Sequence, residues 1–429
     1  MSRAHPCQAF PRSTRLQRLA LPAKAHEVQA DPCTLKRALR GLRADRLASL
    51  YWVESDYPSK RLRATESRPL YGVSAMKPPK SRHPHDTLQT ALRSAFPIDA
   101  RRLVVLSALI LAVIQARTVV LYSLKTHVQL PGTVSARYQR LLRFVQFPIP
   151  DGLFPRFALS FLPNGPLDLI LDRTNWKLGQ QDINILLLSA VWNGFSLPLM
   201  WTLLPHGGAS DSRTRESLVT RFLTLCPDHK VQCLLADREF IGKHWFCFLD
   251  QHGIAPCIRL PARATIGKYR LPVWAVFKKL QVGEVRVWSR QTLIYGVSLR
   301  VAATKNAAGE TLYLAYRGHA GPNLRRYTQR WQAENLHAAL KTRGFNLEDT
   351  GLTRAERLST LLTVVSVAFI WACVTGELLA IQVNVQVKTH GHRAVSVFRL
   401  GLDHLQELLL HPSPSSWRSL ANLMPRFEG

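Results

Sequence analysis

Four polar residues in the stretch YTQRWQAENLHAALK, residues 327–341, have types and a spacing that could serve anionic chemistry. Tyr327, Arg330, Glu334 and Lys341 are separated by three, four and seven residues. At about 100° per residue, an α-helix would place all four on one face, along about 21 Å of its length. One carboxylate between cations suits a phosphate substrate, although a solvated polar stripe would give the same pattern.

Two aspartates that end apolar runs are further candidates for chemistry. Asp172 closes LDLILD, and Asp237 closes VQCLLAD. We predict that these runs are the first and fourth strands of one sheet and lie side by side. Two carboxylates that close do not both ionise readily without a cation. With Glu334 as the third ligand, they would hold Mg²⁺ through hard oxygen atoms, and two such ions can clamp the oxygens of a phosphoryl transfer.

Other carboxylates are weaker candidates for the third ligand. Asp168 shares a strand face with Asp172 but lies about 13 Å earlier, at roughly 3.3 Å per residue. Glu239 is expected at the start of a helix, and Glu348 in a loop. Glu334 is therefore the predicted ligand.

Hydrophobic patterning predicts the elements that must position these residues. Apolar runs at 167–172, 183–192 and 195–204 indicate three consecutive antiparallel strands, with an Asn-Gly hairpin signal between the last two. A helix, a strand, a helix and a strand are then predicted at 210–226, 231–237, 238–253 and 255–261. This order is typical of an RNase H-like core, an α/β fold in which helices flank a mixed sheet.

The remaining sequence suggests six parts. We expect a disordered basic extension (1–75), a helical DNA-binding region (76–160), the two parts of the RNase H-like core (165–261 and 323–381), a β-rich insertion (262–322) and a C-terminal tail (382–429). Met76 opens the regular sequence, and we expect it to be the native start.

Charge and composition narrow the class of partner. Lys and Arg number 57 against 28 Asp and Glu, a formal net charge of +29, which predicts nucleic acid or an anionic membrane as partner. The apolar stretch 103–117 is too short to span a bilayer, and 358–376 carries Ser and Thr throughout. We interpret both as buried helices and expect no membrane association. Seven scattered cysteines without zinc-site spacing fit a reducing cytoplasm.

The segments LDRTNW and LADREF, together with the Tyr-Arg-Glu-Lys quartet, resemble the three signature regions of bacterial DDE transposases of the insertion-sequence-four group. The resemblance covers roughly residues 165–381. It implies an RNase H-like core with a β-rich insertion, and a DNA transposase that cuts transposon ends and joins the 3′-hydroxyl to target DNA. The implied catalytic and metal-binding residues are Asp172, Asp237 and Glu334, holding two Mg²⁺ ions for which Mn²⁺ can substitute.

The resemblance also implies DNA partners. Tyr327, Arg330 and Lys341 would grip the terminal inverted repeats, target DNA would be the second substrate, and a homodimer would act on paired ends in the bacterial cytoplasm, at the nucleoid.

Further DNA contacts are predicted from residue type, each with a plainer reading. Arg137 and Arg140, on a helix expected at 133–147, contact phosphates or form a solvated face. Arg238 contacts phosphate or balances the charge of the site. Trp288, in preference to Trp274, stacks a flipped base, or else both rings pack the insertion.

Three other functions stay open on the sequence alone. The chain could be an RNase H-like nuclease without strand transfer, a non-catalytic DNA-binding relative of a transposase, or a basic membrane protein. Carboxylates repel DNA unless they hold a cation, so the three acidic residues speak against a purely DNA-binding role.

Overall fold

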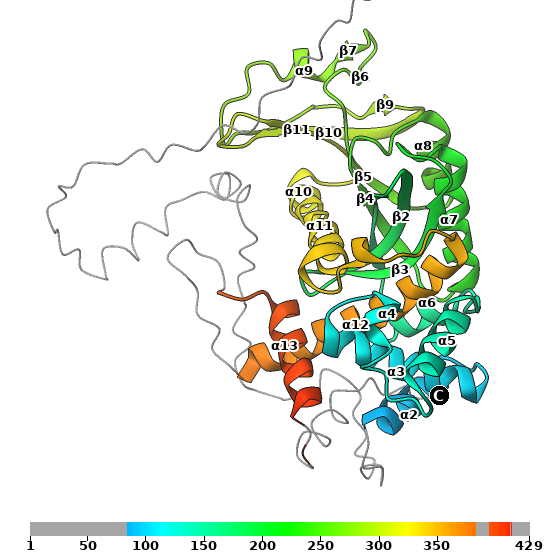
Figure 1. Cartoon of the computed structure of the whole chain (residues 1–429). Helices are drawn as coiled ribbons and strands as arrows, with labels where there is room; N and C mark the ends of the chain where they lie inside the picture. The colour runs from blue at the N-terminus through cyan, green and yellow to red at the C-terminus, as the bar shows by residue number, and fades with distance from the viewer. Residues whose placement is uncertain (1–83, 383–393, 412, 414–429) are drawn as a thin grey trace, which may run out of the picture. The chain divides into compact units, whose positions relative to one another are not determined.

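The computed structural model describes residues 84–382, 394–411 and 413, so the predicted extension at 1–75 and most of the C-terminal tail lie outside the described residues. In the described part, a mixed nine-stranded sheet has the order β3-β2-β1-β4-β5-β11-β10-β8, with β9 paired to β10 (Figure 1). Helices flank this sheet. Its strands are β1 (Leu167–Leu178), β2 (Gln181–Trp192), β3 (Phe195–Leu204), β4 (Val231–Ala236), β5 (Ala255–Arg259), β8 (Val285–Val287), β9 (Thr292–Ile294), β10 (Val297–Lys305) and β11 (Thr311–Tyr316).

Strands β1, β2 and β3 form the predicted antiparallel meander. Asn193 and Gly194 connect β2 to β3 with φ of 44° and 78°, the left-handed conformations that a tight hairpin turn needs. The predicted end of the first strand at Asp172 is wrong, because β1 continues to Leu178. Thr174 and Trp176 are buried there, and the strand stays paired with β2. Asp172 therefore lies in the middle of a strand.

Strand β4 is parallel to β1 and directly beside it, which confirms the predicted adjacency. Strand β5 is parallel to β4 on the other side. The predicted helix at 238–253 starts too early: α8 spans Lys243–Gln251, and residues 238–242 form a turn that ends at Gly242 with φ of 138°. That turn carries Asp237 and Glu239 out of the sheet.

The predicted insertion is β-rich, and four of its strands extend the main sheet, with β9 pairing with β10. Strand β11 pairs antiparallel with β5, then β10 with β11, and β8 with β10. A separate two-stranded ribbon is formed by β6 (Thr265–Ile266) and β7 (Leu271–Pro272), followed by the short α9 (Val273–Val276).

Helices of the described part precede, connect and follow the strands. They are α2 (Pro84–Ala95), α3 (Ala100–Ala116), α4 (Leu121–Leu124), α5 (Val134–Val145), α6 (Leu153–Leu159), α7 (Ser212–Leu225), α8, α12 (Ala355–Gln382) and α13 (Val397–Leu410). The predicted helix at 133–147 is thus confirmed as α5, with the Thr133 side chain accepting from the backbone of Ala136 as its N-cap.

Helix α12 is long and apolar enough to cross a membrane by length and composition, and it is the one such helix in the described ranges. Its most apolar stretch is nevertheless 72% buried inside the protein, which favours a core helix. Glycines let α13 approach it closely. A Cβ on Gly376 would come within 2.0 Å of the Val397 carbonyl oxygen, and one on Gly401 within 1.9 Å of that of Ala372.

The signature stretch is not one continuous α-helix, contrary to prediction. It divides into α10 (Ala320–Thr328), α11 (Trp331–Ala338) and the wider π-helical turn η2 (Ala339–Arg343). Tyr327 and Ala333 of this segment pack in one buried cluster with Ile170 and Leu235, so α10 and α11 cover one face of β1 and β4. Arg330 lies at the junction of the two helices.

Candidate active site

Asp172 lies on β1, and Asp237 directly follows the neighbouring parallel strand β4. Leu171 of β1 is in register with Ala236 of β4, and the two aspartates are the next residues along the chain. Neighbouring strands are about 4.8 Å apart. Side chains alternate between faces, so Asp172 leaves the sheet on the face of Ile170, which α10 and α11 cover. The backbone register thus places the two aspartates at neighbouring positions, where the pairing of β1 with β4 ends.

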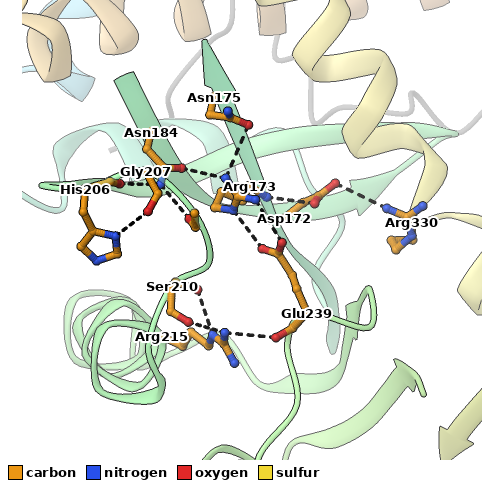
Figure 2. A network of polar contacts seen from close by, with 11 residues as sticks. Asp172, Arg173, Asn175, Asn184, His206, Gly207, Ser210, Arg215, Glu239 and Arg330 are labelled. Carbon is orange, nitrogen blue, oxygen red and sulfur yellow. Dashed lines mark hydrogen bonds and ion pairs between the residues drawn. The ribbon is translucent and has the colours of Figure 1, made fainter. Parts of the chain in front are cut away.

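Glu334 of α11 is connected to this pair through Arg330. The Arg330 guanidinium donates through Nη2 to Glu334 Oε1 at 2.8 Å and through Nη1 to Asp172 Oδ2 at 3.5 Å (Figure 2 shows the Asp172 contact). Burial alone would lower the pKa of Arg330, but nearby Tyr327, Asp172 and Glu334 raise it above the usual value. Arg330 therefore stays charged and bridges two of the three predicted ligands.

Asp172 is held in an environment unfavourable to a lone anion. Burial raises its pKa to about 6, the Arg330 guanidinium and the backbone N–H of Arg173 oppose this, and the carboxylates of Glu239 and Glu334 add to it. Two acidic neighbours and a low-dielectric setting both disfavour the ionised form. The site would gain from a further cation near Asp172.

The rival carboxylates are already engaged. Arg173 contacts both carboxylate oxygens of Glu239, Arg326 donates to Asp168 at 2.7 Å, and Lys341 lies 2.6 Å from Glu348. Glu334 is bonded to Arg330, which also contacts Asp172. Both Glu239 and Glu334 are close enough to raise the pKa of Asp172. Among these four carboxylates, Glu334 is the one whose arginine partner also contacts Asp172.

The chemistry of the donor set fits a divalent cation, although the carboxylates are not gathered around one point. Within the described residues, no three His, Cys, Asp or Glu side chains are grouped closely enough to hold a metal ion. Oδ1 of Asp237 is buried without a hydrogen-bond partner there, and its ion-pair contact with Arg259 is long, at 3.6 Å. Leaving such an oxygen unpaired is unfavourable, and carboxylate oxygens are the ligands that Mg²⁺ prefers.

The other two members of the quartet are Tyr327, which lies near Asp237 and Arg330, and Lys341, which contacts β1. The Tyr327 side chain is 7% exposed, with its hydroxyl buried and unpartnered in the described part, so it offers DNA no surface in this conformation. Burial raises its pKa above the usual value. Lys341 donates to the Asn175 carbonyl oxygen at 3.0 Å and lies 5.6 Å from the centre of the Trp176 ring.

The remaining predicted DNA contacts differ in exposure. Arg238 is exposed in the turn after β4, whereas Arg137 and Arg140 are partly buried on α5. Trp288 is partly buried against the core, and Trp274 is 50% exposed. Exposure therefore favours Trp274 over Trp288 for contact with a base.

The sequence does not predict the polar network that lies next to Asp172 (Figure 2). Arg173 contacts Glu239 and Asn184, and Asn184 donates to the carbonyl oxygens of His206 and Gly208 at 2.8 and 2.9 Å. The buried Arg215 of α7 binds the turn that contains Glu239. The one sequence signal was an acidic residue two positions after Asp237, which was interpreted as a rival metal ligand.

One comparison with known proteins covers the residues of this site. Residues 163–371, which include Asp172, Asp237 and Glu334, match the family model described as the transposase DDE domain. Among curated proteins, no sequence matches this chain. Among solved structures, the piggyBac transposase synaptic complex with hairpin DNA is similar at 10% identity and a TM-score of 0.39, over 82% of this chain and 88% of that chain. So distant a likeness supports no inference. The family match covers slightly less than half of the chain.

Proposed function

We propose that this protein is the DNA transposase of an insertion sequence, which cuts transposon ends by metal-dependent hydrolysis and joins the freed 3′-hydroxyl to target DNA. The observation that carries the proposal is the register of β1 and β4. It sets Asp172 beside Asp237, on the face where α11 presents Glu334 through Arg330. The match of residues 163–371 to a transposase DDE domain supports the same reaction class.

The order of the strands supports an RNase H-like core. An antiparallel meander of β3, β2 and β1 continues into β4 and β5, both parallel to β1 in direction. Helices connect β3 to β4 and β4 to β5, as the sequence order predicts. In such a core the edge after β1 and β4 is where carboxylates from different segments meet.

Asp172, Asp237 and Glu334 would hold two Mg²⁺ ions, for which Mn²⁺ can substitute. When bound, the ions would activate water and stabilise the charge that develops on the scissile phosphate. Because the ions would neutralise Asp172 and Glu334, the Arg330 guanidinium would become available to bind a DNA phosphate. Arg259 remains beside Asp237 and limits the repulsion between the carboxylates.

DNA is the proposed partner, in the form of terminal inverted repeats and target DNA, with a homodimer on paired ends. The net charge of +29 supports a polyanionic substrate. Lys341 and the exposed Arg238 would contact phosphates, with Arg137 and Arg140 of the helical region as further contacts. We propose a bacterial cytoplasmic location at the nucleoid, without membrane association.

The test is a joining assay. The full-length protein, Mg²⁺, labelled duplexes taken from the DNA that flanks the gene, and a supercoiled target plasmid are incubated together. A transposase gives cut ends and labelled ends covalently joined to the plasmid. Cutting without joining would support the alternative of an RNase H-like nuclease, and binding without cutting would support a non-catalytic relative.

A further inference from the structure

Arg173 is the residue after Asp172, and its side chain connects β1 to the turn that follows β4. Its Nε and Nη2 donate to the two carboxylate oxygens of Glu239 at 3.1 and 3.2 Å (Figure 2). Glu239 is only two residues after Asp237. One bidentate ion pair therefore joins the residue directly after Asp172 to the residue two positions after Asp237.

The ion pair between Arg173 and Glu239 lies on the opposite face of β1 from the Asp172 side chain. Successive side chains of a strand leave on opposite faces, so Arg173 points away from the face of Asp172. On that side its Nη1 donates to Oδ1 of Asn184 at 3.1 Å, and Asn184 is 1% exposed. Arg173 is thus anchored to β2 as well as to the turn, which leaves its guanidinium little freedom.

The turn after β4 is also contacted by Arg215 of α7, whose side chain is only 4% exposed. Its Nη2 donates to the backbone carbonyl oxygen of Glu239 at 3.1 Å, and its Nη1 to that of Ile241 at 3.3 Å. Its Nε donates to the Ser210 hydroxyl at 2.8 Å. The backbone and side chain of Glu239 are therefore fixed by two different arginines.

The geometry points to Arg173 and Glu239 as positioning residues that set the placement of Asp237 relative to Asp172 for metal binding. This inference rests on the proposed function of the site. The fork of Arg173 neutralises Glu239, so that a further carboxylate does not compete for the ion, and it fixes the backbone that carries Asp237. Groups that orient metal ligands in this way typically change metal affinity or activity by about 10–100-fold when removed.

The experiment compares Glu239→Gln, Arg173→Met and the double variant in the full-length protein bound to the flanking-DNA duplex. Calorimetry measures Mn²⁺ affinity, and a titration measures the Mg²⁺ concentration for half-maximal cleavage. Each single change should weaken Mn²⁺ binding about 10–100-fold and raise the Mg²⁺ requirement in parallel, with duplex affinity unchanged. Because the two residues act as one unit, the double variant should be no worse than either single one.

Arg173→Lys is the second probe, since it keeps the charge but loses the two-pronged contact. It should fold like the parental protein and show an intermediate loss of Mn²⁺ affinity. The matched control is Asp403→Asn on α13, which removes ion pairs to Arg399 and Arg117 and should leave Mn²⁺ affinity unchanged.

Two results would overturn the positioning role while leaving the proposed function intact. One is parental Mn²⁺ affinity in Glu239→Gln and Arg173→Lys. The other is a double variant whose losses multiply, as independent sites require. A parental protein that binds no Mn²⁺ and does not cleave the duplex would instead contradict the proposed function itself.

Discussion

Two regions of the molecule treat charge in opposite ways. Around β1 and β4, acidic side chains are matched by arginines: Asp172 and Glu334 by Arg330, and Glu239 by Arg173. In the ribbon of β6 and β7 within the insertion, the exposed Lys268 and Arg270 form no ion pair with the described residues. They flank Tyr269, which is 80% exposed, and Trp274 follows four residues after Arg270.

The difference indicates a division of labour. Compensated charges in a partly buried setting interact strongly and are held in place, which suits chemistry that needs fixed geometry. Uncompensated cations on a surface keep their attraction for a polyanion and release counterions when it binds. The β1–β4 region would then perform the reaction, and the ribbon of the insertion would help hold the substrate.

The largest expected effect is the loss of DNA cleavage when the proposed metal ligands near β1 and β4 are replaced. Asp172→Asn, Asp237→Asn and Glu334→Gln should each reduce cleavage by several orders of magnitude, because a catalytic metal supplies several kcal/mol and each 1.4 kcal/mol is about tenfold. Duplex binding should persist. A cleavage time course with a parallel gel-shift measurement checks this, with Glu310→Gln in the β10–β11 turn as control. Parental cleavage in Glu334→Gln, combined with loss in Glu348→Gln, would show that the third ligand is wrongly assigned.

A second effect concerns the stability of the charge-compensated region. Burial, Lys341 and Arg330 lower the pKa of His337 to about 4, against about 6.5 in the unfolded chain. Between these values the unfolded state binds more protons, so stability is fully present above about pH 6.5 and falls as the pH drops toward 4. The loss of unfolding free energy is at most about 3.5 kcal/mol, at about 1.4 kcal/mol per pKa unit.

His337→Gln should flatten this pH dependence, as measured by denaturant unfolding between about pH 4 and 7. The matched control is His252→Gln, which changes an exposed histidine at the end of α8. An unfolding free energy of the His337→Gln variant that falls with pH as steeply as that of the parental protein would assign the slope to other groups.

The two tryptophans of the insertion should respond differently. Trp274→Ala should slow second-strand cleavage by about one to two orders of magnitude, since stacking on a base contributes about 1–3 kcal/mol. Trp288 packs against the core, so Trp288→Ala should chiefly lower the melting temperature. An abasic site at the stacked position should restore part of the Trp274→Ala loss. Parental second-strand rates in both variants, with both folded, would make the insertion a scaffold only.

The smallest effect concerns the unpaired cations of the ribbon. Replacing Lys268 and Arg270 by Ala should weaken duplex binding severalfold and lower the log–log salt slope by about 0.9 for each DNA phosphate that is no longer neutralised. Arg399→Ala provides the comparison, because Arg399 is already paired with Asp403. Equal changes in salt slope for the paired and unpaired cations would remove the distinction drawn between the two regions.

Sequence patterns predicted the parts of the site that depend on backbone order. Apolar runs ending in Asp172 and Asp237 indicated adjacent strands, and the register of β1 and β4 confirms the adjacency. The pairing of Arg173 with Glu239 was not predictable, because it depends on how a turn packs against α7 and β2. The prediction of a continuous helix through Arg330 was wrong for a related reason. Helical spacing of residues does not reveal a break that tertiary contacts stabilise.

Whether Asp172 and Asp237 hold the catalytic metal is tested most directly by counting Mn²⁺ ions. Electron paramagnetic resonance measures how many Mn²⁺ ions are bound to the protein–duplex complex. We expect about two ions per active site, and we expect Mn²⁺ binding to be lost in both Asp172→Asn and Asp237→Asn while the duplex remains bound. Binding of Mn²⁺ that is unchanged in both variants would contradict the central claim that these two aspartates hold the catalytic metal.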